Sequence, residues 1–120
     1  MARILIVDDD IAMLEFLSKA LDNAGHNVVT KDNGRDALDL IKADQNFDLI
    51  LSDVIMPGMD GIELSSEVAK LLPSLKIMFI TGFSAVALGT KNPAQMGQAV
   101  MSKPFHLNEL VKRVDEILSE

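Results

Sequence analysis

Five polar residues stand at the ends of short apolar runs, and their types fit phosphoryl-transfer chemistry. Three are carboxylates, Asp8, Asp9 and Asp53, one is a hydroxyl, Thr81, and one is an amine, Lys103. Carboxylates that are brought together repel one another unless they protonate or share a cation. An all-oxygen site of this kind suits Mg²⁺, which takes one or two carboxylates and keeps several waters. The sequence therefore predicts a magnesium site if these residues meet.

Asp53 is the candidate nucleophile of this group. A carboxylate is ionised at neutral pH and needs no general base, but the charge of the transferring phosphoryl group must be neutralised. Mg²⁺ would supply one positive pole and the Lys103 ammonium the other, while the Thr81 hydroxyl would donate to a phosphoryl oxygen. The sequence has no Gly-rich loop of the GxxxxGK type, so the site does not look built for a nucleotide. We therefore expect phosphoryl transfer from a bound donor.

The apolar runs alternate with helical patterns along the chain. Strands are predicted at 3–7, 28–30, 47–53, 76–81 and 99–102, and helices at 11–24, 34–41, 61–72 and 107–118. Asp10 and Asp60 are predicted to cap the helices that follow them. Runs without polar alternation indicate strands buried on both faces, so the pattern predicts an α/β fold with a doubly wound, five-stranded parallel sheet and helices on both faces. In such sheets the ligand site lies at the carboxyl ends of the strands, where the five polar residues should meet.

Residues 83–98 interrupt this alternation. The run Ala85–Leu88 could form one helical turn, but Gly89, Pro93 and Gly97 break the pattern. We therefore expect a broken segment between the fourth and fifth strands.

Composition and charge exclude several classes of protein. The chain has 120 residues, which is one domain's worth, so we expect a single domain over 1–120. Its net charge of −7 repels nucleic acid and anionic lipid. It has no cysteine, no apolar run that could span a bilayer and no secretory signal pattern, and we expect a cytoplasmic protein.

Four motifs in this order resemble the receiver domain of two-component response regulators. They are the Asp8–Asp9 pair, Asp53 followed by Met56–Gly61, Thr81, and Lys103–Phe105. The resemblance covers essentially the whole chain, and it implies a single receiver domain over 1–120 with no fused output domain. It implies a flavodoxin-like fold with strand order 2-1-3-4-5, and a signalling protein rather than an enzyme.

The resemblance also implies the roles of the site residues. Asp53 would be phosphorylated by a histidine kinase or a histidine phosphotransfer protein. Asp8, Asp9 and Asp53 would hold Mg²⁺, with the carbonyl group of Ile55 as a further ligand.

The same resemblance implies that Thr81 and Lys103 sense the phosphoryl group. It also implies that the peptide bond between Lys103 and Pro104 is cis.

Two departures from the family pattern concern the output of the signal. Receivers usually carry an aromatic residue three positions before the lysine, where this chain has Val100. A short, β-branched side chain cannot report by a large ring rotation. The broken segment 83–98 also replaces a regular fourth helix. We predict that reordering of 83–98 takes the place of the aromatic switch.

Two stretches, Ile80–Ser84 and Ala99–Phe105, are similar to a subgroup, the CpdR-type stand-alone receivers. Those cell-cycle regulators of alphaproteobacteria act as adaptors for the ClpXP protease. The similarity implies a downstream protein partner such as ClpX or ClpXP. The alternatives are a relay intermediate or phosphate sink without output and, with less support, a metal-dependent hydrolase of small phosphates.

Overall fold

The computed structural model describes residues 2–81, 99–102 and 107–119, with only the backbone described at 81, 99–102 and 107. The predicted broken segment and the peptide bond between Lys103 and Pro104 lie outside these residues. Within the described ranges, none of the helices is long and apolar enough to cross a membrane.

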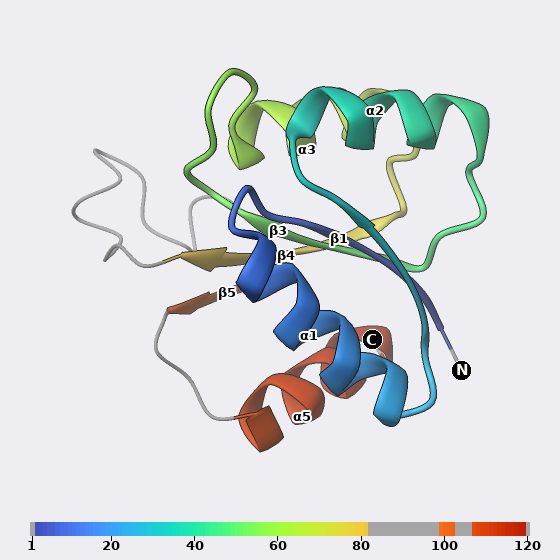
Figure 1. The fold of residues 1–120 in the computed structure, drawn as a ribbon. Coiled ribbons are helices and arrows are strands. Elements are labelled where there is room, and N and C mark those ends of the chain that lie inside the picture. Colours follow the sequence, from blue (N-terminus) through green and yellow to red (C-terminus); the bar gives the residue numbers. More distant parts are fainter. Residues whose placement is uncertain (1, 82–98, 103–106, 120) are drawn as a thin grey trace.

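A single parallel sheet of five strands forms the centre of the molecule (Figure 1). Its strands are β1 Arg3–Val7, β2 Asn27–Lys31, β3 Leu49–Asp53, β4 Lys76–Thr81 and β5 Ala99–Ser102. The order across the sheet is β2-β1-β3-β4-β5, and every neighbouring pair is parallel. The predicted fold class and strand order are therefore confirmed.

Four described helices cover the two faces of this sheet. They are α1 Ile11–Asn23, α2 Gly34–Ala43, α3 Gly61–Leu71 and α5 Leu107–Leu118. In Figure 1, α1 and α5 lie on one face and α2 and α3 on the other. Asp10 and Asp60 cap α1 and α3 as predicted, since their carboxylates accept hydrogen bonds from the amides of Met13 and Glu63.

Two hydrophobic cores, one on each face, explain why β1 has no polar alternation. Ile4 and Ile6 pack with residues of α1 and α5, whereas Leu5 and Val7 pack with residues of α2 and α3. All four side chains are fully buried. Successive side chains of a strand point to opposite faces, so a strand between two cores must be apolar at every position.

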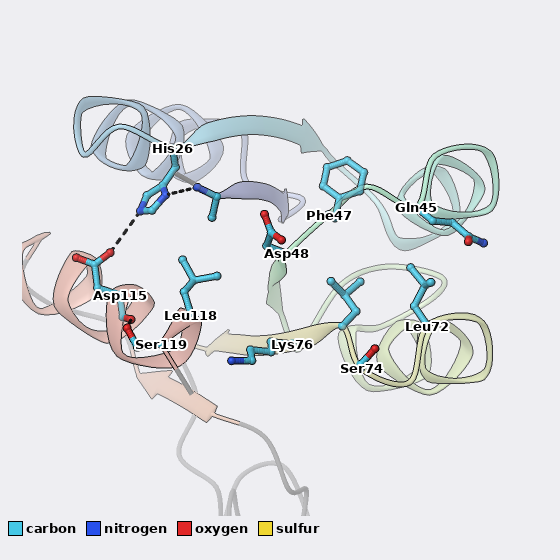
Figure 2. Close-up of a pocket in the computed structure, with 12 residues that line it drawn as sticks. His26, Gln45, Phe47, Asp48, Leu72, Ser74, Lys76, Asp115, Leu118 and Ser119 are labelled. Carbon is cyan, nitrogen blue, oxygen red and sulfur yellow. Dashed lines mark hydrogen bonds and ion pairs between the residues drawn. The ribbon is translucent and has the colours of Figure 1, made fainter.

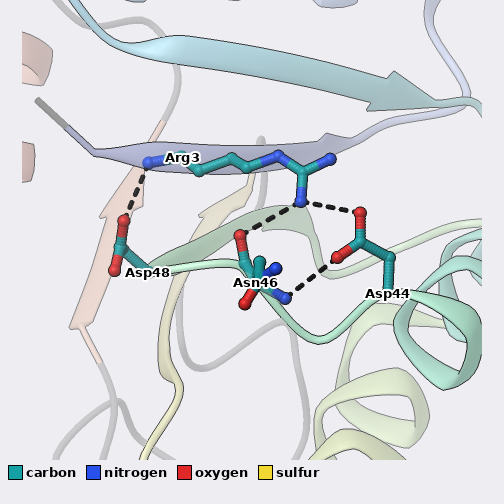
Figure 3. A network of polar contacts seen from close by, with 4 residues as sticks. All are labelled: Arg3, Asp44, Asn46 and Asp48. Carbon is teal, nitrogen blue, oxygen red and sulfur yellow. Dashed lines mark hydrogen bonds and ion pairs between the residues drawn. The ribbon is translucent and has the colours of Figure 1, made fainter.

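The predicted third strand is wrong at its start, because β3 begins at Leu49 rather than at residue 47. Phe47 and Asp48 belong to the connection that follows α2. The Asp48 carboxylate accepts a hydrogen bond from the Arg3 amide at 2.9 Å (Figure 3). The Asp48 amide also donates to the Arg3 carbonyl at 2.8 Å. The Arg3 guanidinium lies 4.2 Å from the centroid of the Phe47 ring, which covers this junction.

The same arginine ties the end of α2 to the sheet (Figure 3). Its guanidinium donates to the Asp44 carboxylate at 2.7 Å and to the carbonyl of Asn46 at 3.1 Å. The Asn46 amide and the Arg3 guanidinium together hold the pKa of Asp44 below its ordinary value. The connection between α2 and β3 is therefore fixed by polar contacts rather than by strand pairing.

The predicted first helix is also slightly too long. It ends at Asn23, and Ala24 is exposed at the C-cap rather than buried with Leu14, Leu17 and Leu21. The amide of Ala24 still bonds to carbonyls of the last turn, so the helical hydrogen bonding continues while the buried face does not.

Candidate metal and phosphoacceptor site

Three carboxylates meet at the carboxyl edge of the sheet. Val7 of β1 pairs with Ser52 of β3, so the residues that follow in each strand emerge side by side. One ligand oxygen from each of Asp8, Asp9 and Asp53 lies within 4.8 Å of the other two. The structure thus brings together the three acidic residues that the sequence singles out, and an all-oxygen set of this size fits Mg²⁺.

Asp8 is the buried member of this acidic cluster, with 1% of its surface exposed. Its Oδ1 accepts a hydrogen bond from the amide of Asp10 at 2.9 Å, and its own amide donates to the carbonyl of Lys31 at 3.2 Å. Asp9 is exposed. A buried carboxylate beside two others is unfavourable unless a cation neutralises it, which is the physical reason to expect a divalent ion here.

Asp53 is the last residue of β3 and pairs with Ile80 of β4. Its Oδ1 accepts a hydrogen bond from the amide of Ile55 at 3.3 Å. This contact closes a small turn of the kind that Asp residues form with the backbone two residues later. It links the orientation of the Asp53 carboxylate to the backbone of Ile55, the residue whose carbonyl is the expected further ligand.

The loop from Val54 to Asp60 is packed tightly against its neighbours. The amide of Gly61 donates to the carbonyl of Val54 at 2.9 Å, and a Cβ on Gly61 would collide with the carbonyl oxygen of Asp53. The first residue of α3 therefore rests directly on the backbone of the candidate nucleophile. Only glycine allows so close an approach.

Ser52, the residue before Asp53, lies beneath the contact between Gly61 and the Asp53 carbonyl group. No role was predicted for it from the sequence. It is 1% exposed, and its hydroxyl donates to the carbonyl of Asp53 at 2.9 Å. A serine inside an apolar strand is the one sequence feature that could have indicated this contact, because a buried hydroxyl requires a hydrogen-bond partner. The identity of that partner depends on the tertiary structure.

The structure places the remaining predicted residues only in part. Thr81 is the last residue of β4 and pairs with Ser102 of β5, so its backbone lies at the same edge as Asp53. The Thr81 side chain and Lys103 lie outside the described residues. Their roles as sensors of a phosphoryl group stay predictions.

A hollow of about 710 Å³ lies at the opposite, amino-terminal edge of the sheet (Figure 2). His26 at its wall accepts a hydrogen bond at Nδ1 from the amide of Ala2 at 3.2 Å, and its Nε2 lies 3.4 Å from the Asp115 carboxylate. Because Nδ1 is the acceptor, Nε2 carries the proton in the neutral ring and is not available as a metal ligand. Among the described residues, the group of carboxylates that could share a metal ion lies at the carboxyl edge instead.

Comparison with known proteins identifies the family. Residues 4–115 match the family model of the response regulator receiver domain. The chain belongs to this family.

Three relatives illustrate the match. The chain is 48% identical to the response regulator receiver protein CpdR of Brucella abortus over 98% of each protein. It is 32% identical to the sensor kinase CckA of the same organism, over 99% of this chain but only 13% of the kinase. Among solved structures, the chemotaxis protein CheY4 of Vibrio cholerae superposes with a TM-score of 0.85 at 31% identity, covering 98% of both chains.

Membership of the family carries several general properties. Receiver domains are signalling proteins rather than classical enzymes, they interact with histidine kinases, and they bind Mg²⁺ through acidic residues. The acidic cluster of Asp8, Asp9 and Asp53 fits the last of these properties.

Proposed function

We propose that this protein is a stand-alone, cytoplasmic response regulator that accepts a phosphoryl group on Asp53. The convergence of the Asp8, Asp9 and Asp53 carboxylates at the carboxyl edge of the sheet is the observation that carries the proposal. The match to CpdR over nearly the full length of both proteins supports the stand-alone form.

The phosphoryl donor in this proposal is a phosphohistidine of a kinase or phosphotransfer protein. An Asp53 oxygen attacks phosphorus, the phosphorus–nitrogen bond breaks, and its electron pair returns to the imidazole, which takes a proton from water. Asp53 then carries an acyl phosphate. This transfer requires charge neutralisation and alignment more than acid–base catalysis.

Each site residue has a separate part in this reaction. Asp8, Asp9 and Asp53, with the carbonyl group of Ile55, would hold Mg²⁺, which supplies positive charge to the phosphoryl oxygens when bound. Lys103 and Thr81 would bind the phosphoryl oxygens and report their presence.

The output in this proposal is a change of affinity for a protein partner. The resemblance to CpdR-type receivers implies the ClpXP protease as that partner, with this chain as its adaptor. A relay intermediate or phosphate sink would use the same chemistry at Asp53 but would pass the phosphoryl group back to a histidine protein without binding another partner.

The first test is phosphorylation by acetyl phosphate with Mg²⁺, followed by mass spectrometry of the intact protein. We expect one phosphoryl group on the wild type and none on Asp53→Asn. Asp39→Asn, an exposed position on α2, serves as the matched control and should behave as the wild type. Phosphorylation of Asp53→Asn at the wild-type rate would overturn the proposal.

The second test separates an adaptor from a relay. Wild type loaded with beryllofluoride and the Asp53→Ala variant are compared for binding to purified ClpX. State-dependent binding supports the adaptor. Equal binding, together with rapid transfer back to a histidine phosphotransfer protein, would support the relay.

A further inference from the structure

We propose that Ser52 is a positioning residue for Asp53, acting through the carbonyl group of Asp53 rather than on the phosphoryl group. The proposal rests on the assignment of Asp53 as phosphoacceptor. It assigns a function to a side chain that is fully enclosed and cannot touch a phosphodonor.

Ser52 is the only polar residue of β3 before Asp53, since Leu49, Ile50 and Leu51 are apolar. Strand alternation puts it on the same face as Ile50, which belongs to the core under α2 and α3. Burial of a hydroxyl among apolar side chains is unfavourable unless it is hydrogen-bonded. The donation to the carbonyl of Asp53 at 2.9 Å satisfies the hydroxyl and directs it at the candidate nucleophile.

The contact lies at the end of β3. The register of β1 with β3 runs from Leu49 to Ser52, and Asp53 pairs with Ile80 of β4. The Ser52 hydroxyl and the close-packed Gly61 together enclose the Asp53 carbonyl group; a Cβ on Gly61 would lie 3.1 Å from Ser52 Oγ.

The orientation of this carbonyl group sets the geometry of the metal site. The peptide unit that follows Asp53 joins it to Val54, and the amide of the next residue, Ile55, donates to the Asp53 carboxylate at 3.3 Å. Rotation of that peptide unit would shift the Ile55 amide and so disturb the hydrogen bond that orients the Asp53 carboxylate, one ligand atom of which lies within 4.8 Å of those of Asp8 and Asp9. Small displacements at such sites reduce metal affinity and reaction rate, because both depend on alignment.

The test compares Ser52→Ala with Ser65→Ala. Ser65 is a matched control: it is 6% exposed, and its hydroxyl donates to the carbonyl of Ile62 at 2.8 Å within α3. Each variant removes one buried hydroxyl bound to a backbone carbonyl group while keeping a small side chain. Three quantities are measured for each: the melting temperature, the Mn²⁺ dissociation constant of the unphosphorylated protein by electron paramagnetic resonance, and the rate of phosphorylation at saturating Mn²⁺.

We expect similar melting temperatures for the two variants. Ser52→Ala should weaken Mn²⁺ binding by roughly tenfold, as is typical when a group that orients a metal ligand is removed. It should also slow phosphorylation at saturating metal. Ser65→Ala should change neither quantity. Equal Mn²⁺ affinities and equal rates for the two variants would overturn the proposal.

The outcomes also separate this proposal from the one on which it rests. If the wild type binds Mn²⁺ but accepts no phosphoryl group, the proposed function fails whatever Ser52 does. If the wild type is phosphorylated and Ser52→Ala matches it, only the positioning proposal fails. Should Ser52→Ala not fold, the comparison is repeated with Ser52→Cys and Ser65→Cys, which keep only a weak donor. Ser52→Cys must then bind Mn²⁺ more weakly than Ser65→Cys, by a smaller factor than expected for alanine, and equal affinities would overturn the proposal.

Discussion

Gly34 at the start of α2 lies against the backbone of Met59, so closely that a Cβ on Gly34 would be 2.7 Å from the Met59 carbonyl oxygen. Met59 belongs to the loop from Val54 to Asp60, which follows Asp53 and contains Ile55. The loop is therefore fixed at two points, by Gly34 of α2 and by Gly61 of α3. The Gly34 contact involves no residue of the acidic cluster, whereas Gly61 lies against the carbonyl oxygen of Asp53 itself. Both contacts hold the backbone that follows Asp53.

Gly34→Ala tests the first of these contacts. Alanine is normally the better residue inside a helix, but here its methyl group meets a backbone oxygen that cannot rotate away. We expect a loss of about 1–3 kcal/mol in the free energy of unfolding, as in other overpacked sites. Urea denaturation measures the change. Arg35→Ala, at the exposed next position, should stay within about 0.5 kcal/mol of the wild type.

The acidic cluster predicts an order of stability among its own variants. In metal-free buffer, Asp9→Ala relieves repulsion and should melt no lower than the wild type. Asp8→Ala relieves the same repulsion but loses the hydrogen bond from the Asp10 amide, so it should melt below Asp9→Ala. Scanning calorimetry with and without Mg²⁺ gives the order.

Both variants should also lose the stabilisation that the metal provides to the wild type. That stabilisation is about 2.7 kcal/mol when the metal is at a hundredfold excess over its dissociation constant. Phosphorylation of Asp9→Ala at an unchanged rate would contradict the metal assignment.

The variant Lys103→Arg keeps the positive charge but replaces a compact ammonium group with a planar guanidinium group. We expect Asp53 to be phosphorylated in this variant and the signalling response to be lost. Amide chemical shifts before and after phosphorylation measure the response. A full set of wild-type shift changes would show that the shape of the cation is unimportant.

The contact between Arg3 and Asp44 predicts a pH dependence of stability. The pKa of Asp44 is lowered in the folded protein, so its contribution is complete above the ordinary value of 3.8 and disappears as the pH falls through the lower folded value. The stability difference between the wild type and Asp44→Asn should follow this course. Urea titrations over an acidic pH series measure it, and a difference that does not change with pH would contradict the assignment.

Elements whose signal is local were predicted well from the sequence. The bounds of β1, β4 and β5 match because each is a continuous apolar run between polar residues. The caps Asp10 and Asp60 match because a capping side chain bonds to amides three residues later. The acidic cluster was predictable because parallel strands deliver their carboxyl ends to one edge.

Features that depend on distant contacts were not predictable in this way. Phe47 is of a residue type that favours strands, but it lies in the connection before β3, where its ring packs against the Arg3 guanidinium. The Ser52 hydroxyl contacts the carbonyl group of Asp53, and Gly34 lies against the carbonyl group of Met59. No sequence pattern indicates either partner. The predicted reordering of residues 83–98 lies outside the described residues and stays a prediction.

The far end of α5 is attached to the first residue of β4. The Lys76 ammonium donates to the carbonyl of Ile117 at 2.7 Å, where the exposed carbonyls of a helix end favour a cation. The other end of α5 follows Lys103 closely in the chain. Because the Lys76 contact holds the end of α5 at Ile117, we expect any displacement of this helix to be smaller there than at the end that follows Lys103 in the chain.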